Sequence, residues 1–251
     1  MKRYLDLVLY KTLADLRAES ARAYFGFVWW IFEPIMYMGA FYLVFGILLN
    51  QSGKDYVAFL LTGLIVWKWF AGGVALASSS IMLNDGLIRQ VYLPKVIFPT
   101  IAVLSATSKY LVTLLLFLVF IILSGYGVSV QWLWIPVLLV LQFFLIWSVG
   151  SFLASLMPFF PDLRLLVENG LLLLFFLSGI FFDIASLSQS AQNYLMLNPM
   201  AIIITSYREI LIYGLTPPSL ALLGVFLFSI ILSMISIGLI KKFDQVYPKV
   251  V

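Results

Sequence analysis

Four ionisable side chains fall inside long apolar stretches, where a charge is costly: Glu33, Lys68, Lys109 and Glu168. A charge at the centre of a bilayer costs about 2.5–3.5 kcal/mol, so each should face a bundle interior, water or a counter-charge. The two lysines lie about half way through their stretches, and the two glutamates lie near one end. The four residues either line a polar path or form structural pairs, and the sequence leaves both open. A proton relay is less favoured, because the set lacks histidine and its depths do not match.

Other catalytic chemistry has little support in the sequence. It contains no Cys and no His, which removes thiol nucleophiles, disulfides and the commonest metal ligand. It also lacks a GxxxxGK[ST] loop, so the chain does not bind ATP in the P-loop manner. We therefore expect no catalytic residue, no metal site and no cofactor in this chain. A membrane glycosyltransferase or acyltransferase is disfavoured for the same reasons.

The composition predicts an all-α integral membrane protein. Hydrophobic residues make up 63% of the 251 residues and charged residues 10%, and the mean hydropathy is +1.09. A soluble domain carries about a quarter of charged residues. A helix needs about 20 residues to cross the hydrocarbon, and windows of that size predict six spans in one domain, residues 1–251. The spans lie near 27–49, 57–80, 99–124, 132–157, 164–183 and 219–240.

Residues 1–24 precede the first span and form an amphipathic helix by their spacing. Leu5, Leu9, Leu13 and Leu16 share one helical face, while Leu7 is a misfit on the polar side. Charges throughout the segment exclude a signal peptide. The pattern favours a helix in the headgroup plane of the membrane, and the alternative is a solvated helix that packs on a partner.

The distribution of basic residues predicts the orientation. Lys54 and Arg208 fall on one side of the six spans and eleven basic residues on the other, so the second side is cytoplasmic and both termini lie there. The eleven are Lys2, Arg3, Lys11, Arg17, Arg22, Arg89, Lys95, Arg164, Lys241, Lys242 and Lys249.

A short polar segment, 84–99, interrupts the apolar stretches on the cytoplasmic side. It carries Asp85, Arg89 and Lys95 and cannot lie in hydrocarbon. Nothing between Gly86 and Tyr92 breaks a helix, so about two helical turns can form there. A short helix joined at both ends to spans is suited to receive a push from another protein.

The segment 184–218 is too apolar for an ordinary outer loop and too short to cross twice. Asn198 followed by Pro199 is typical of a helix start. A helix from Pro199 to Tyr213 would be about 21 Å long, less than the hydrocarbon thickness. We expect two short re-entrant helices that dip into the outer leaflet and form a gate over a cavity. The alternative is an amphipathic hairpin on the outer surface.

Aromatic residues make up 17% of the chain, and several fall well inside the spans. Such rings usually face lipid or pack in the core. A second interpretation is that some line a channel and stack on flat sugar faces, which would let a polymer slide. The candidates are Tyr37, Phe41, Tyr42, Phe175, Phe176, Phe181 and Phe182. Gly72-Gly73 is interpreted as a close-packing site.

A series of short motifs, in order along nearly the whole chain, resembles the membrane subunits of polysaccharide-exporting ABC transporters. These are the exporters of O-antigen, capsule and teichoic acid. The motifs are Tyr24-Phe25-Gly26-Phe27-Val28-Trp29, Glu33-Pro34, Val44-Phe45-Gly46, Gly63-Leu64-Ile65-Val66-Trp67, Asn84, Leu87-Ile88-Arg89, Leu93-Pro94-Lys95, Pro161-Asp162-Leu163-Arg164, Asn198-Pro199-Met200 and Tyr207-Arg208-Glu209.

The resemblance implies a subunit of the bacterial cytoplasmic (inner) membrane that works as a homodimer with two separate cytoplasmic ATPase subunits. ATP and Mg would bind to those subunits, and a lipid-linked polysaccharide such as O-antigen would pass between the two copies; no nucleic acid is implied. The segment 84–94 would be the coupling helix, and the gate would include Asn198, Pro199, Arg208 and Glu209. The alternatives are an ABC exporter of a drug or lipid and, less favoured, a secondary transporter. The coupling residues would be Asn84, Asp85, Leu87, Ile88, Arg89, Tyr92, Pro94 and Lys95.

Overall fold

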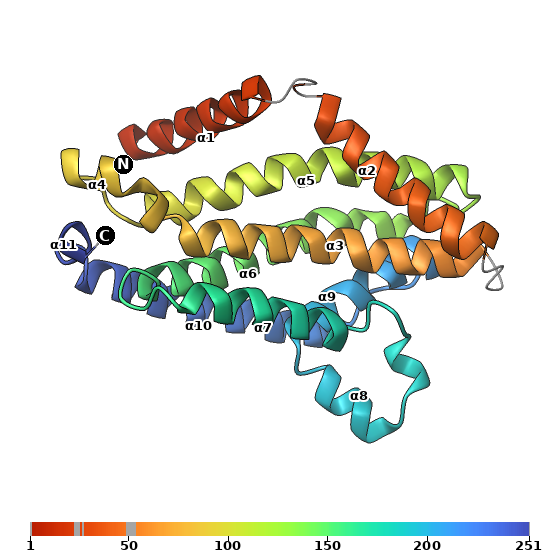
Figure 1. Cartoon of the computed structure of the whole chain (residues 1–251). Coiled ribbons are helices and arrows are strands. Elements are labelled where there is room, and N and C mark those ends of the chain that lie inside the picture. Colours follow the sequence, from red (N-terminus) through yellow and green to blue (C-terminus); the bar gives the residue numbers. More distant parts are fainter. Residues whose placement is uncertain (1, 23–25, 27, 49–53, 251) are drawn as a thin grey trace.

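The computed structural model describes residues 2–22, 26, 28–48 and 54–250, and all regular elements in these ranges are helical (Figure 1). The all-α prediction is therefore confirmed. The α-helices are α1 (Lys2–Arg22), α2 (Val28–Phe41), α3 (Lys54–Ser79), α4 (Asp85–Gln90), α5 (Ile97–Leu123), α6 (Ile135–Leu156), α7 (Leu163–Leu177), α8 (Gln189–Leu195), α9 (Pro199–Arg208), α10 (Ser219–Lys242) and α11 (Tyr247–Val250). Short 3-10 or π segments are η1 (Tyr42–Leu48), η2 (Met82–Asn84), η3 (Val130–Trp134), η4 (Ile184–Ser186) and η5 (Glu209–Tyr213).

Four helical stretches in the described part of the chain are long and apolar enough to cross a membrane. They are Asp55–Ser79, Ile97–Leu123, Val130–Leu156 and Ser219–Lys242. The ends of each stretch lie within about two residues of the ends of a predicted span. The agreement is expected because long apolar runs are the strongest signal that a sequence carries for a membrane helix. The protein is therefore a multi-pass membrane protein.

The first predicted span is a shorter helix whose geometry changes along its length. α2 is followed directly by the π-helical segment η1, so helical structure runs from Val28 to Leu48. Pro34 lies inside α2 and is buried. The predicted ends of this span, residues 27 and 49, lie outside the described residues.

The fifth predicted span, 164–183, is wrong at its C-terminal end. α7 ends at Leu177, and its 15 residues give about 22 Å, less than the hydrocarbon thickness. Gly179 has a φ of 68°, in the left-handed region that ends helices. An apolar sequence alone does not reveal this turn, because Gly179 is followed by Ile180 and two phenylalanines.

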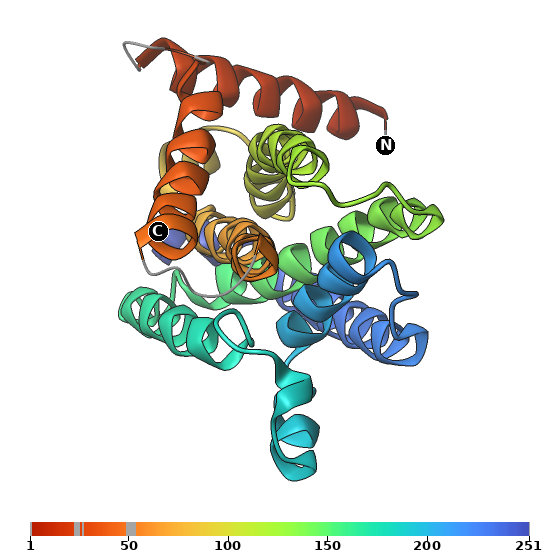
Figure 2. The same cartoon turned by 90° about the vertical axis from the view of Figure 1, so that its right-hand side faces the viewer.

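α3 is the central helix of the bundle, and α2, α5, α6, α7 and α9 lie around it (Figure 2). In the most apolar part of α3, 83% of the residues are buried inside the protein, whereas in the corresponding part of α10 the share is 22%. A Cβ added at Gly150 of α6 would come within 2.5 Å of Ala77, so the two helices touch closely there. A Cβ at Gly73 would meet Ile146 at 2.7 Å, whereas one at Gly72 meets nothing within 4 Å. Of the Gly72-Gly73 pair, only Gly73 is a close-packing site.

α1 lies against the first half of α5, and the predicted leucine face is only partly buried; the side chain of Leu5 lies outside the described ones. Val8, Thr12 and Leu16 are buried, whereas Leu9 and Leu13 stay exposed. Leu7, the predicted misfit, is partly buried and packs with Val8 against Ile97 and Ile101 of α5. The sequence did not predict the contact with α5, because periodicity describes a single helix; the position of α1 in the headgroup plane stays a prediction. The exposed leucines lie next to this face and remain available to lipid.

Both chain ends and α4 lie at the same end of the long helices (Figure 1). α11 packs beside α4. The loop between α6 and α7 also turns at this end, while α8 projects from the bundle further along (Figure 1). The elements that the sequence assigns to one side of the membrane therefore gather in one place.

Candidate functional site

The segment that connects α3 to α5 contains a helix, shorter than predicted. α4 runs from Asp85 to Gln90, and Val91 is already extended, with φ −135° and ψ 135°. The predicted helix reached Tyr92. Pro94 disfavours helical backbone at Leu93, so a helix here has to end before Leu93, and α4 ends at Gln90.

α4 rests on a small core of its own and exposes the rest of its surface. Ile88 is buried in a cluster with Ile81, Phe98 and Tyr247. In contrast, the side chains around the helix are exposed and several are large and apolar, including Tyr92 at 71%. We call them the α4 surface: Leu83, Asp85, Leu87, Arg89, Val91 and Tyr92. Asn84 is half-buried, and its side chain donates to the carbonyl oxygen of Ser80 at 2.8 Å.

Lys95 is not at the surface, although the resemblance implied that it contacts a partner. Its side chain is only 2% exposed, and its ammonium lies 3.6 Å from Oδ1 of Asp244, beyond the end of α10. The Tyr92 hydroxyl donates to the other carboxylate oxygen of Asp244 at 2.9 Å, and the Lys95 ammonium lies 4.8 Å from the Tyr92 ring. The hydrogen bond to Asp244 raises the pKa of Tyr92. These three side chains tie the α4–α5 connection to the end of α10.

A second tie joins the C-terminal helix to the end of α6. The hydroxyl of Tyr247 donates to the carbonyl oxygen of Ser155 at 3.0 Å, and its ring packs on Phe159 at 5.7 Å. Burial raises the pKa of Tyr247 to about 12. Sequence reasoning missed Asp244 and Tyr247. The available signal was one acidic residue and one tyrosine directly after the last span, in an otherwise basic tail.

The charged side chains inside the spans form pairs. Lys68 of α3 donates to Glu33 of α2, and Lys109 of α5 donates to both carboxylate oxygens of Glu19 on α1, each at 2.9 Å. Arg164 of α7 donates a hydrogen bond from Nε to Oε1 of Glu168, four residues later on the same helix, at 3.0 Å. The expectation of mismatched depths was wrong for Glu33 and Lys68, which touch because α2 crosses α3. Pairing of Lys109 with α1 was not predicted.

The channel candidates fall into two groups of rings. Tyr37 and Phe41 of α2 lie 4.9 Å apart, and Tyr42, the first residue of η1, is exposed. Phe175, Phe176 and Phe181 form the second group at the end of α7, with ring centroids 5.1–6.0 Å apart. Phe175 also lies 5.8 Å from Trp67 of α3, and Phe182 is half-buried. Packing therefore accounts for most of these rings, while Tyr42 and Phe176 are exposed on the subunit surface.

α8 and α9 form a sharply bent pair, with 107° between α8 and the helix that continues through η5. Asn198 caps α9 by accepting from the backbone N–H of Met200 at 2.9 Å, and Pro199 is at the first helical position, as predicted. The Asn198 amide also donates to Ser178 Oγ at 2.9 Å. α9 is buried in the bundle whereas α8 is exposed, so the surface-hairpin interpretation does not hold for α9.

Arg208 ties α9 to two other elements. It is 3% exposed and donates to the carbonyl oxygens of Phe59 at 3.1 Å, Gly179 at 2.7 Å and Ile180 at 2.8 Å. Its guanidinium also stacks on the Phe59 ring at 3.3 Å. Arg208 therefore holds the turn after α7 against α3. Glu209, its neighbour, is half-buried.

Comparison with known proteins places this arrangement in a family. The family described as ABC-2 type transporter matches residues 14–212, which run from within α1 into η5. The chain belongs to the ABC-2 type transporter family. The resemblance identified from the motifs is confirmed at this level.

The relatives of this ABC-2 type chain align with it over most of its length and most of their own. The O-antigen export system permease protein RfbA of Klebsiella pneumoniae is 27% identical over 83% of this chain and 81% of its own. The protein of the same name from Myxococcus xanthus is 26% identical over 92% and 89%. The polysialic acid transport protein KpsM of Escherichia coli is 24% identical over 93% and 92%.

Proposed function

We propose that this ABC-2 type chain is the membrane subunit of an ATP-driven exporter that carries a lipid-linked polysaccharide across the cytoplasmic membrane. The observation that carries the proposal is that relatives matched over most of their length are named for O-antigen export and polysialic acid transport. The exposed α4 surface supplies the place where an ATPase subunit would act.

In this proposal the chain crosses the membrane six times. The passes are α2 with η1, α3, α5, η3 with α6, α7 with the turn that follows it, and α10. α8 and α9 dip into the outer leaflet as the gate. The α4 end is cytoplasmic, in keeping with the basic residues that gather there, and both termini lie on that side.

Two copies of this chain and two ATPase subunits form the transporter. The ATPase subunits bind ATP and Mg and press on the α4 surface and on the loop between α6 and α7. Because Ile88 is buried and Lys95 is paired with Asp244, α4 cannot move alone. A push on α4 is therefore passed to α5 and α10 as a rigid-body movement.

The polysaccharide passes between the two copies. Phe176 is exposed on α7 and Tyr42 is exposed at the start of η1, which continues α2; α2 and α7 lie on the same side of α3 (Figure 2). Aromatic faces can stack on sugar rings with little loss of hydrogen bonding, so a chain of sugars can slide past them. Opening of α8 and α9 completes the path.

The experiment is an ATPase assay on the chain reconstituted in lipid nanodiscs with its ATPase subunit. We expect ATP hydrolysis to rise several-fold with a lipid-linked polysaccharide and to stay at the basal rate with hydrophobic drugs or added phospholipid. The control is the ATPase subunit without this chain. Stimulation by a drug or phospholipid but not by the polysaccharide would instead identify an exporter of small hydrophobic molecules.

A further inference from the structure

A groove of about 510 Å³ lies between α6 and α10. The residues that line it fall within 134–144, at the start of α6, and within 219–226, at the start of α10. Leu141 and Leu222, each 6% exposed, form its floor. Both helices end beside α4 and α11, so the groove lies toward the opposite end of the bundle (Figure 1).

The groove exists because α6 and α10 touch at one level and separate at another. Nearer to α4, the hydroxyl of Ser236 donates to the carbonyl oxygen of Ser148 at 3.2 Å, and both serines are buried. Small side chains allow two membrane helices to approach closely. Toward the other end the lining side chains are large, including Trp134, Phe144 and Phe226, and a groove remains between the two helices. Its shape is therefore fixed by packing within one subunit.

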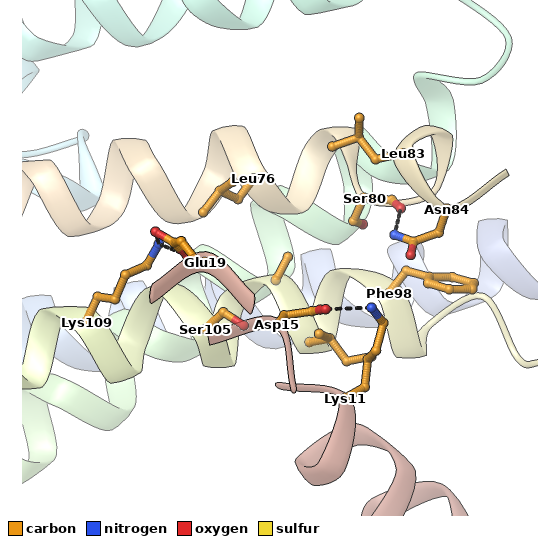
Figure 3. Close-up of a pocket in the computed structure, with 12 residues that line it drawn as sticks. Lys11, Asp15, Glu19, Leu76, Ser80, Leu83, Asn84, Phe98, Ser105 and Lys109 are labelled. Carbon is orange, nitrogen blue, oxygen red and sulfur yellow. Dashed lines mark hydrogen bonds and ion pairs between the residues drawn. The ribbon is translucent and has the colours of Figure 1, made fainter. Parts of the chain in front are cut away.

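The groove differs in kind from the cavity of about 190 Å³ between α1, α3 and α5. That cavity is lined by charged side chains that pair with one another, Lys11 with Asp15 and Lys109 with Glu19 (Figure 3). Its charges are therefore satisfied within the subunit. The groove between α6 and α10 is open on the outside of the bundle, and its walls need a partner from outside the chain.

The lining of the groove suits a hydrocarbon chain that carries a polar group at one end. Among its lining side chains, only the indole of Trp134 and the hydroxyl of Ser219 contain a polar atom. Both lie at the very start of their helices, and tryptophan is enriched at the level where the membrane meets water. A molecule held here would place its apolar part along the groove and its polar part beside these two residues.

The open side of the groove faces the membrane. Val140 and Leu223, on opposite walls, are 56% and 50% exposed. Both belong to stretches that are long and apolar enough to cross a membrane. The exposed surface of such a stretch is covered either by lipid tails or by another membrane helix.

The length of the groove decides between these two partners. Residues 134–144 rise by about 15 Å along a helix. The hydrocarbon core is about 30 Å thick, so the groove extends over about one leaflet. A membrane-crossing helix of a second copy would leave about half of its length outside the groove. The tail of a phospholipid, in contrast, belongs to a single leaflet.

We propose that the groove binds one acyl chain of a phospholipid from the leaflet on the side away from α4. The chain lies between Val140 and Leu223 and ends near Phe144, and the ester region of the lipid lies beside Trp134 and Ser219. We call this site the acyl-chain groove. It takes a lipid by its tail and not by its headgroup, and it does not depend on which substrate the transporter exports.

The test is native mass spectrometry of the purified full-length chain in detergent, titrated with four probes. Dioleoylphosphatidylcholine and dioleoylphosphatidylethanolamine have the same tails and different headgroups. Oleoyl-lysophosphatidylcholine has one tail, and glycerophosphocholine has the headgroup without a tail. We expect one molecule of either two-tailed lipid per subunit with similar affinities, binding of the one-tailed lipid, and no binding of glycerophosphocholine.

Three variants locate the bound lipid. Leu223→Trp and Val140→Trp each fill the groove from one wall with a larger apolar ring. Leu220→Trp is the matched control, because Leu220 lies on the same helix as Leu223, is 84% exposed and lies outside the lining of the groove. We expect the affinity for dioleoylphosphatidylcholine to fall about tenfold in each groove variant and to stay at the parent value in the control. Size-exclusion chromatography and thermal unfolding of each variant separate a folding defect from a binding defect.

Several results would overturn the proposal. Unchanged lipid affinity in both folded groove variants would exclude the groove as the site, and an equal loss in Leu220→Trp would show lipid bound over the whole surface of α10. A tenfold preference for one headgroup, or binding of glycerophosphocholine, would show recognition of the headgroup instead of the tail. If Leu223→Trp lowered the proportion of dimers without changing the lipid affinity, a second copy would be the partner of the groove. None of these readouts requires ATP hydrolysis or polysaccharide export.

Discussion

Gly63 of α3 leaves the space that the guanidinium of Arg208 occupies. A Cβ added at Gly63 would lie 2.8 Å from Nη2 of Arg208 and 3.4 Å from Cα of Ile180. The same guanidinium donates to the carbonyl oxygens of Gly179 and Ile180. The absence of a side chain at one position therefore allows the charged group to join α9, α3 and the turn after α7.

Substitutions at this junction should destabilise the subunit. Gly63→Ala forces Arg208 away from its carbonyl partners, and Arg208→Met leaves those carbonyls buried without a donor. We expect each to lower the free energy of unfolding by about 1.5–3 kcal/mol, the range for hydrogen bonds to charged groups. Thermal unfolding in detergent measures the effect, with Gly72→Ala as control because its Cβ meets nothing within 4 Å. Equal stability of Gly63→Ala and Gly72→Ala would contradict the tight fit.

The Lys95–Asp244 pair should contribute to stability through mutual interaction. Lys95→Met leaves Asp244, which is 17% exposed, without its cation, and Asp244→Asn leaves the buried Lys95 without its anion. We expect a loss of about 1–3 kcal/mol for each single variant and a smaller additional loss in the double variant. A double-mutant cycle by thermal unfolding measures the coupling. Strictly additive losses would show that the two groups, 3.6 Å apart, do not interact.

The raised pKa of the Tyr247 phenol predicts that the folded protein loses stability at alkaline pH. Its pKa in the folded protein is about 12, above the usual value of about 10, so folding favours the neutral phenol. The stabilisation is complete below pH 10 and is lost as the pH rises from 10 to about 12. Tyr247→Phe cannot ionise, so the gap in stability between parent and variant should narrow over this interval. A gap that stays constant across the interval would argue against the raised pKa.

Arg89 on the α4 surface should be needed for communication with the ATPase subunit. Arg89→Glu reverses a charge on an exposed part of α4 and leaves the buried Ile88 in place. We expect ATP hydrolysis stimulated by transport to fall to the basal level, while membrane insertion and the amount of purified chain remain unchanged. Lys241→Glu, a charge reversal on an exposed residue at the same end, is the matched control. Full stimulation in Arg89→Glu would exclude a coupling role for this residue.

The elements that could be predicted are those with strong local signals. Long apolar runs gave α3, α5, α6 and α10 to within a few residues, and Asn198-Pro199 marked the start of α9. The polar residues from Asn84 onward indicated a helix outside the membrane, where α4 is found. Each of these depends on composition or on a cap formed within two or three residues along the chain.

The missed features depend on contacts between residues far apart in the sequence. Lys109 meets Glu19 ninety residues earlier, and Arg208 meets carbonyls nearly thirty residues earlier. The packed face of α1 is chosen by α5, and the early end of α7 depends on a glycine turn that Arg208 stabilises. Hydropathy and periodicity describe a single helix and carry no information about its neighbours.

The most direct test of the account is a transport assay in proteoliposomes that contain this chain with its ATPase subunit and a radiolabelled lipid-linked polysaccharide. The account predicts that the glycan becomes protected inside inverted vesicles only when ATP is supplied, and that vesicles with this chain alone show none. Protection of the glycan by this chain without an ATPase subunit, or none with ATP and both subunits present, would contradict it.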